Sequence, residues 1–221
     1  MTCYAHTLEG QPPERWQLLE SHLDEVARRA GIFAAAFGGE AWAALAGRWH
    51  DLGKYSVEFQ SRLSALGGAD AHLEETVGVA AKVDHSTAGA QHAVRELKLF
   101  GPLLAYLVAG HHAGLPNGED ATSTCLQERL RKLIPDYASA PVSALAVPEP
   151  APRPPGHSLV SGYSLGFFLR MAFSALVDAD WLDTEAFMSR EKADARAQQP
   201  QPPLAALRDC LAAYLSRFGV P

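Results

Sequence analysis

The sequence predicts an all-α fold, a helical bundle, on three grounds. Apolar residues recur at helical spacing in several segments, whereas the alternation of apolar and polar residues that marks strands is almost absent. Glycine and proline separate these segments, as they do at the ends of helices. The chain has 221 residues, 48% of them hydrophobic, which is enough for one domain with a sizeable core.

Three helices are predicted before residue 67. The first spans Trp16 to Phe37, and its apolar positions at near-helical spacing are Leu18, Leu19, Val26, Ile32 and Phe33. His22 should face inward, because it lies about one turn from several of these positions. The second helix spans Glu40 to His50 and has an apolar stripe of Trp42, Leu45, Ala46 and Trp49. The third, Tyr55 to Leu66, should end at Gly67-Gly68.

Three further helices are predicted after residue 85. Ser86 or Thr87 can cap a helix that runs to Leu99. Gly101-Pro102 begins the next helix, whose apolar run leads to His111-His112. Residues Thr122 to Leu133 are also predicted to be helical.

A proline-rich segment interrupts the helical pattern at residues 135–156. It contains seven prolines and few charges, so it cannot continue a helix and should form a long surface loop. A long helix then spans Leu159 to Asp183, with one face formed by Phe173, Leu176, Val177 and Asp180. From residue 198 the chain reads as a short spacer, followed by an amphipathic helix from Leu204 to Phe218.

Composition limits the compartment in which the protein can act and the partners that it needs. No apolar run approaches the roughly 20 residues of a membrane span, and no secretory signal opens the sequence. The three cysteines have no CxxC spacing, so we expect a protein of the reducing cytoplasm. The formal net charge is −6, which is unfavourable for holding DNA unaided, because non-specific affinity comes largely from neutralised phosphates. Recruitment by another protein is therefore expected.

Two polar doublets stand at predicted helix ends. His50-Asp51 is followed by Gly53, which could end the helix and let both side chains turn toward one ion. The doublet His111-His112 similarly ends an apolar run and precedes Ala113-Gly114. Together with His22, His85 and Asp180, these residues suit transition-metal ions, because neutral imidazoles bind such metals well and carboxylates can bridge two of them.

These residues carry a family resemblance. Their order resembles that of the HD superfamily of metal-dependent phosphohydrolases. More narrowly, the sequence resembles the HD nuclease of type I CRISPR interference, which is usually fused to a helicase. The resemblance covers roughly residues 1 to 190, and four segments match in order: residues 4–6 (YAH), 50–60 (HDLGKYSVEFQ), 84–90 (DHSTAGA) and 177–185 (VDADWLDTE).

The resemblance implies an HD-domain helical bundle with a two-metal centre. One ion would be held by His22, His50, Asp51 and Asp180, and the other by Asp51, His85, His111 and His112. Asp51 would bridge the two ions and act in catalysis. The histidine-rich shell favours Mn, Fe, Co or Ni over Mg, since magnesium prefers oxygen ligands. We expect two divalent ions of these four kinds rather than Mg or Zn. Asp178 competes for the last carboxylate position, but helical phase favours Asp180.

Other side chains are assigned less central roles. Lys54, a candidate catalytic residue, follows His50 by one turn and could contact a substrate phosphate; the alternative is a surface lysine. Ser86 and Thr87 are candidates for substrate binding, although helix capping is the simpler interpretation. His72 and His92 should face solvent, and Phe167 should lie in the core. The candidates for stacking on unpaired bases are Tyr55, Phe59, Tyr163 and Trp181.

The resemblance also sets the expected organisation and function. We expect an HD nuclease domain over residues 1–197, with the proline-rich loop inside it, because the spacer begins at residue 198. The segment 198–221 could then lead toward a helicase. The expected activity is metal-dependent hydrolysis of single-stranded DNA in CRISPR antiviral defence, with a helicase and an RNA-guided surveillance complex of the Cascade type as partners. One alternative is an HD phosphohydrolase acting on nucleotides or cyclic nucleotides. The other is an inactive metal-binding interaction module.

Overall fold

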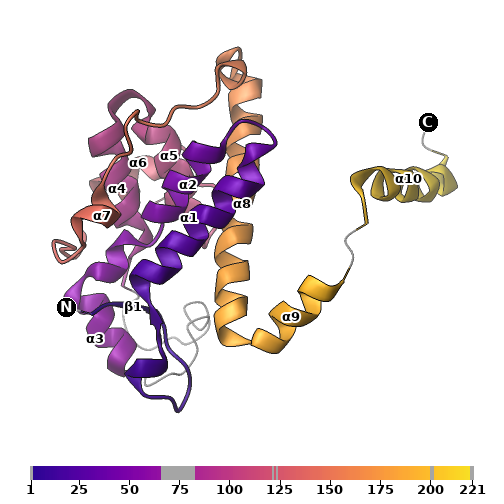
Figure 1. Ribbon diagram of the computed structural model, residues 1–221. Helices are drawn as coiled ribbons and strands as arrows, with labels where there is room; N and C mark the ends of the chain where they lie inside the picture. Colours follow the sequence, from indigo (N-terminus) through magenta and orange to yellow (C-terminus); the bar gives the residue numbers. More distant parts are fainter. Residues whose placement is uncertain (1, 66–82, 121, 123, 200–201, 220–221) are drawn as a thin grey trace. The chain divides into compact units, whose positions relative to one another are not determined.

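The computed structural model describes residues 2–65, 83–120, 122, 124–199 and 202–219, and it divides into two units, Met1–Met188 and Ser189–Pro221 (Figure 1). The first unit ends nine residues before the domain boundary expected at residue 197, which stays a prediction. In its described part the strands are β1 (Tyr4–His6) and β2 (Gln17–Leu18), and the α-helices are α1 (Leu19–Ala35), α2 (Glu40–Trp49), α3 (Val57–Ala65), α4 (Ser86–Leu97), α5 (Gly101–Gly110), α6 (Leu126–Arg131), α7 (Val142–Leu145) and α8 (Gly162–Met188). Short 3-10 turns, among them Leu52–Tyr55 and Gly156–Leu159, connect several of these helices. The predicted all-α class is confirmed.

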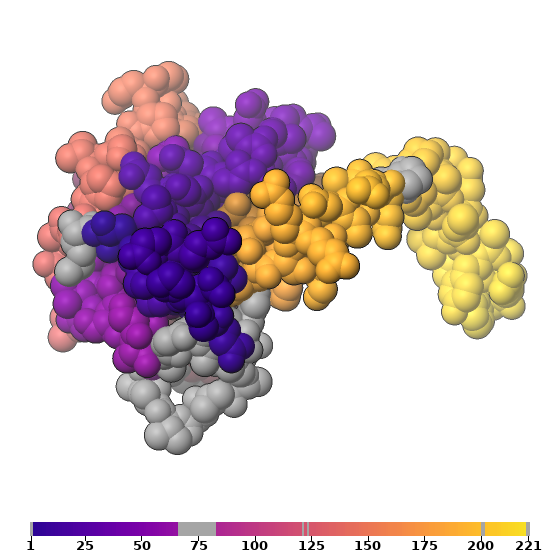
Figure 2. Space-filling model, turned by 60° about the horizontal axis from the view of Figure 1, so that its bottom comes forward, coloured from indigo at the N-terminus to yellow at the C-terminus, as the bar shows by residue number. Residues whose placement is uncertain are grey.

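The two strands form a short antiparallel pair, with Tyr4 opposite Leu18 and His6 opposite Gln17. This pairing fastens the N-terminus beside the start of α1, where the amide of Leu19 donates to the carbonyl of Cys3. The N-terminal residues, coloured indigo, form the surface of the first unit on the side shown in Figure 2. As a result His6 is held close to the helices that follow.

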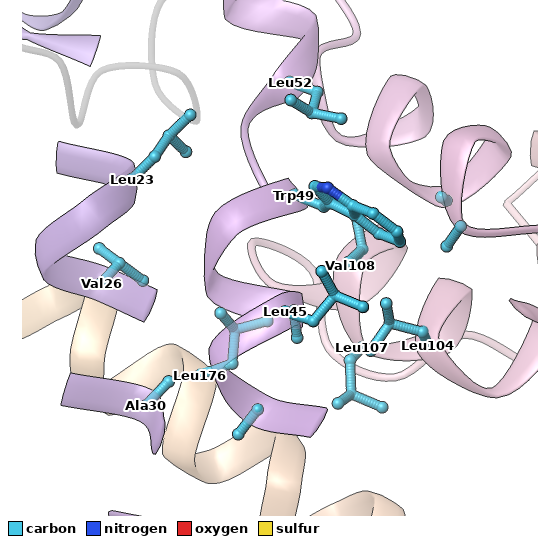
Figure 3. Close-up of a cluster of buried hydrophobic side chains, with 14 of the residues drawn as sticks. Leu23, Val26, Ala30, Leu45, Trp49, Leu52, Leu104, Leu107, Val108 and Leu176 are labelled. Atoms are coloured by element: carbon cyan, nitrogen blue, oxygen red, sulfur yellow. The ribbon is translucent and has the colours of Figure 1, made fainter. Parts of the chain in front are cut away.

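The core lies where α1, α2 and α8 pack on one another and where α4 packs on α5 (Figure 3). Its largest fully buried side chains include Trp42, Trp49, Leu104 and Leu176. The indole nitrogen of Trp49 donates to the carbonyl of Ala144 at 3.1 Å, so α7 of the proline-rich segment is fixed to the end of α2. Outside α7, the described backbone of residues 135–155 has no helix or strand.

Several local predictions are wrong. The first helix begins at Leu19 instead of Trp16, and its buried face runs through His22, Val26 and Ala30. Ile32 lies on the opposite face and is 57% exposed. Phe33, in the last turn of the helix, is 39% exposed, and Leu18, outside the helix, is 45% exposed. Helix α6 is shorter than predicted, and Leu133 beyond its end is fully exposed. Phe167, expected in the core, is 57% exposed.

His92 was expected to face solvent but is buried. Its Nε2 lies 3.0 Å from the carbonyl oxygen of Leu145, and its ring meets the edge of Trp49 at 4.7 Å between centroids. Both partners are far from His92 in the sequence, so the residues next to His92 do not indicate its burial. His72 and the predicted helix end at Gly67-Gly68 lie outside the described residues.

The second unit contains α9 (Arg190–Gln198) and α10 (Leu204–Leu215), which a 3-10 turn at Ser216–Phe218 extends. The predicted final helix is thus present, and its apolar residues Leu207, Leu211 and Tyr214 are about half exposed. Within the residues that the structure describes, no helix combines the length and apolarity needed to cross a membrane.

Gly89 lets α4 approach the end of α2, since a Cβ atom there would overlap the carbonyl oxygen of Trp49. We predict that Gly89→Ala lowers the free energy of unfolding by about 1–3 kcal/mol, because the added Cβ atom forces the backbone of α2 and α4 apart. Urea denaturation measures the change.

Gly162→Ala is the matched control. Gly162 opens α8, and an added Cβ would meet nothing within 4 Å, so its variant should stay within about 0.5 kcal/mol of the parent. Equal stabilities for the two variants would show that α4 and α2 are less closely packed than described.

Candidate metal centre

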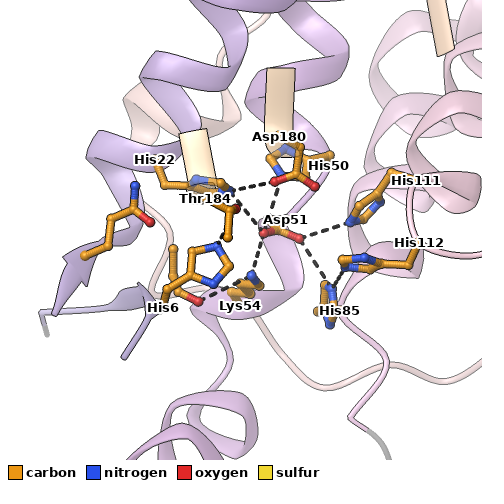
Figure 4. A network of polar contacts seen from close by, with 12 residues as sticks. His6, His22, His50, Asp51, Lys54, His85, His111, His112, Asp180 and Thr184 are labelled. Atoms are coloured by element: carbon orange, nitrogen blue, oxygen red, sulfur yellow. Dashed lines mark hydrogen bonds and ion pairs between the residues drawn. The ribbon is translucent and has the colours of Figure 1, made fainter. Parts of the chain in front are cut away.

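Both predicted doublets stand at helix ends. His50 caps the C-terminus of α2 in helical conformation, and Asp51 then leaves the helix with φ −113° and ψ 21°. This change of backbone direction lets the two neighbouring side chains point to the same interior space (Figure 4). His111 caps α5 in the same way, and Gly114, with φ 88°, ends that helix through a bond from its amide to the carbonyl of Gly110.

Gly53 has a different role from the predicted one. It is not a left-handed helix cap; a Cβ atom at this position would overlap the backbone of His85. The amide of Gly53 donates to the carbonyl of His85 at 3.2 Å. Gly53 therefore allows the segment after Asp51 to lie directly against the residue that precedes α4.

Asp51 occupies the middle of the cluster, and its two carboxylate oxygens face different histidines. Oδ2 lies 3.6 Å from Nε2 of His22 and 3.4 Å from Nε2 of His50. Oδ1 lies 3.4 Å from Nε2 of His85 and 3.3 Å from Nε2 of His111. Asp51 and these four histidines are buried. One carboxylate thus stands between two pairs of imidazoles.

Asp180 lies on the side of the cluster that holds His22 and His50, and His112 lies on the side that holds His85 and His111. Oδ1 of Asp180 lies 3.4 Å from Nε2 of His22 and 3.6 Å from Nε2 of His50. Nε2 of His112, which is exposed, lies 2.8 Å from Nε2 of His85. Three groups of potential ligand atoms result: Asp51, His85, His111 and His112; His22, His50 and Asp51; and His50, His111 and Asp180.

The hydrogen bonds of the rings indicate that a cation fits between them. Nδ1 of His50 donates to the carbonyl of Gly47, and Nδ1 of His111 donates to the carbonyl of Val108, each at 2.7 Å. Because a carbonyl only accepts, these bonds place a hydrogen on Nδ1, so the neutral form of each ring has its lone pair on Nε2. Among the described residues, these two Nε2 atoms and Oδ1 of Asp51 are buried without a hydrogen-bond partner. Lone pairs that converge in this way suit a divalent metal ion.

The electrostatics of the cluster lead to the same conclusion. Burial disfavours the charged form of His22, yet Asp180, Asp183 and Asp51 outweigh this effect and raise its pKa to about 10. Burial likewise opposes the charged form of His50, but Asp51 and Asp180 raise its pKa to about 9. The pKa of Asp51 is lowered despite its burial, chiefly by His50 and Lys54. The buried carboxylates require positive charge beside them, which protons or metal ions can supply.

Asp183 is a residue of the site that the sequence analysis missed. Its Oδ2 accepts hydrogen bonds from Nδ1 of His22 at 2.6 Å and from the side-chain amide of Gln17 at 2.7 Å. It lies one helical turn after Asp180, and this spacing was the signal that could have found it. Asp178 is exposed and lies away from the cluster.

Lys54 and His6 lie beside the cluster. Lys54 is buried, so its interpretation as a surface lysine is wrong. Its ammonium lies 2.8 Å from Oδ2 of Asp51 and 3.3 Å from the carbonyl oxygen of Ala5. His6, whose role the sequence left open, meets the ring of His22 edge-on at 5.0 Å between centroids. Its Nε2 lies 3.3 Å from the hydroxyl of Thr184.

Ser86 and Thr87 lie at the start of α4, but neither side chain caps that helix. Asp84 caps it instead, because its carboxylate accepts bonds from the amide and the hydroxyl of Thr87 at 3.0 and 2.8 Å. Arg129 of α6 donates to the hydroxyl of Ser86 at 2.6 Å and to the carbonyl of Ala109. Arg129 therefore ties the start of α4, next to His85, to the end of α5, next to the histidine doublet.

A cavity of about 680 Å³ opens beside this part of the cluster, and His85 and His112 form part of its wall. Ser86 also lines it, whereas Thr87 does not. Of the four aromatic residues predicted to stack on bases, Tyr55 and Phe59 are buried, so they cannot do so. Tyr163 and Trp181 are 84% and 61% exposed, but they do not line the cavity.

The geometry agrees with what comparison with known proteins shows. No curated protein sequence matches the chain. The family model described as Cas3, HD domain matches residues 8–183, and thus most of the first unit with His22, the doublets and Asp180. The chain therefore belongs to the Cas3 HD-domain family, the HD-type nucleases of CRISPR defence.

Proposed function

We propose that this chain is a nuclease that hydrolyses phosphodiester bonds of single-stranded DNA with two divalent transition-metal ions. The observation that carries the proposal is the placement of Asp51, whose two oxygens face separate pairs of histidines. In this proposal His22, His50 and Asp180 serve one ion, and His85, His111 and His112 serve the other. Asp51 would serve both ions. The nitrogen-rich set favours Mn, Fe, Co or Ni over Mg, and we propose these four ions rather than Zn.

Two ions in such a site activate water and stabilise the charge that develops on a phosphate. The chain's own residues prepare for this chemistry. Asp183 and the carbonyls of Gly47 and Val108 orient three imidazoles through their Nδ1 atoms. Lys54 holds positive charge beside Asp51, and we propose that it also helps position the substrate phosphate.

The substrate and partners follow from the family and from the charge of the chain. With a formal net charge of −6, the chain has little electrostatic free energy for binding DNA unaided. We therefore propose that a helicase and an RNA-guided surveillance complex deliver an opened strand to it. The three cysteines are free thiols, which suits action in a reducing cytoplasm.

A nuclease assay after chelation and metal replacement tests the proposal. The substrates are single-stranded DNA, duplex DNA, mononucleotides and cyclic nucleotides, each with Mn²⁺, Fe²⁺, Co²⁺, Ni²⁺, Zn²⁺ or Mg²⁺. Cleavage of single-stranded DNA with the first four ions is expected. Activity confined to mononucleotides or cyclic nucleotides would instead identify a nucleotide phosphohydrolase. Metal binding without hydrolysis of any substrate would identify an interaction module.

We predict that Asp180→Asn loses metal and activity, whereas Asp178→Asn keeps both. The two residues lie on the same helix, but only Asp180 contacts His22 and His50, and Asp178 is exposed. Elemental analysis of purified protein and single-turnover cleavage provide the two measurements. Equal losses of metal and activity in the two variants would contradict the assignment of Asp180 as a metal ligand.

We predict that Asp183→Ala weakens metal binding about 10- to 100-fold through the loss of the bond that orients His22. Isothermal titration with Mn²⁺ or Co²⁺ gives the dissociation constants, and Asp178→Asn serves again as the control. An unchanged dissociation constant would show that the bond from Asp183 to His22 does not support metal binding.

We predict that the chain alone cleaves single-stranded DNA and leaves a relaxed, end-sealed duplex almost intact. The metal centre is mostly buried, with His112 as its exposed member, so a flexible strand can bring a phosphate to it and a rigid duplex cannot. Gel analysis of both substrates at matched concentrations measures the ratio. Efficient cutting of the sealed duplex would contradict the proposed route of access.

A further inference from the structure

The cavity of about 680 Å³ reaches the candidate metal centre at His85 and His112. Its wall also includes Asp84, Ser86, Arg129 and Lys132, which come from the start of α4 and from the end of α6. Its size is that of a site for a small molecule or for a short stretch of a polymer. Anything that lies in this cavity is next to the reacting centre of the proposed nuclease, on which this inference rests.

The two cations of the wall differ in what they can offer a ligand. The guanidinium of Arg129 already donates hydrogen bonds to Ser86, Ala109 and, at 3.4 Å, Thr87. Lys132 makes a 3.2 Å ion pair with Asp84, and its side chain is 46% exposed. A half-exposed pair of this kind contributes little and is readily exchanged for another anion. Lys132 is thus the cation of the wall that can turn to a phosphate.

Ser86 adds a neutral donor close to the metal centre. Its oxygen accepts from Arg129, and among the described residues its hydroxyl hydrogen has no acceptor. The hydroxyl of Thr87, in contrast, donates to Asp84 at 2.8 Å and lies outside the cavity wall. Ser86 follows His85 directly in the chain, so a ligand held by Ser86 is held next to a candidate metal ligand.

The described wall suits a sugar-phosphate backbone better than bases. It contains no Phe, Tyr or Trp side chain on which a base could stack, but several hydroxyl and amide groups, among them those of Asn117 and Thr124. Phosphate contacts position a strand without reading its sequence. The expected occupant is therefore a strand of any sequence.

We propose that this cavity binds the phosphate next to the scissile one in a single strand, with Nζ of Lys132 and the hydroxyl of Ser86 as its donors. Lys132 leaves Asp84 to pair with the incoming phosphate, and Arg129 keeps the wall in place. The contact positions the strand so that the neighbouring phosphodiester faces His85 and His112. Lys132 and Ser86 thus determine preference for polymeric substrates.

The test compares a polymer with a minimal phosphodiester. The substrates are an oligothymidylate and bis(p-nitrophenyl) phosphate, which has no neighbouring phosphate. Lys132→Ala should raise KM for the oligonucleotide roughly 10-fold, the effect of losing a charged hydrogen bond. It should leave KM for bis(p-nitrophenyl) phosphate and the metal content unchanged. The slope of log KM against log salt concentration should fall by about 0.7, as expected for one lost contact with a single strand.

Arg131→Ala is the matched control, because Arg131 directly precedes Lys132 at the end of α6, pairs with Glu128 and is outside the cavity wall. It should change neither KM nor the salt slope appreciably. Ser86→Ala should raise KM for the oligonucleotide alone, by less than Lys132→Ala. If Lys132→Ala unfolds, Lys132→Gln, which keeps the length of the side chain, replaces it.

The outcomes separate this inference from the proposed function. Equal effects of Lys132→Ala and Arg131→Ala would overturn the inference, and so would an equal loss with both substrates. In either case the wild-type protein would still cut the oligonucleotide. If the wild-type protein hydrolyses only bis(p-nitrophenyl) phosphate, the proposed DNA substrate is wrong. The inference about Lys132 and Ser86 is then wrong as well.

Discussion

The buried carboxylate of Asp51 is the constraint on which the rest of the site depends. An unpaired charge in a protein interior is costly, so the chain must place positive or hydrogen-bonding groups around it. Lys54 provides one such group at 2.8 Å, and the imidazoles of His22, His50, His85 and His111 converge on the two oxygens. Each of these four histidines therefore lies in the first turn of a helix or directly at a helix end.

Residues with a local signal could be predicted from the sequence. His50-Asp51 and His111-His112 were recognised because each doublet ends an apolar helical run, and the structure does place both doublets at helix ends. Helical phase separated Asp180 from Asp178, and the burial of the two residues follows that phase. The all-α class followed from periodicity alone. In each case the information needed lay within one or two turns of the residue concerned.

Residues whose environment is made by distant parts of the chain could not be predicted. The partners of His92 lie on α2 and in the proline-rich segment, so its burial depends on how these pack. Arg129 joins α4 to α5, although in the sequence it resembles any basic residue of an exposed helix. Gly53 was expected to end a helix. Instead it lets the backbone of its segment lie directly against the backbone of His85, and no local pattern indicates this contact. Tertiary packing decided each of these.

The bonds from His50 to Gly47 and from His111 to Val108 have a consequence for how the centre is assembled. Each ring is fastened to a carbonyl three residues earlier on its own helix, so its direction is set as soon as that helix end forms. Each of the two helix ends thus carries one imidazole whose direction is already set. Packing of α2 against α5 brings these two imidazoles to opposite oxygens of Asp51. The centre can therefore be altered by shifting a whole helix, with the individual ring orientations retained.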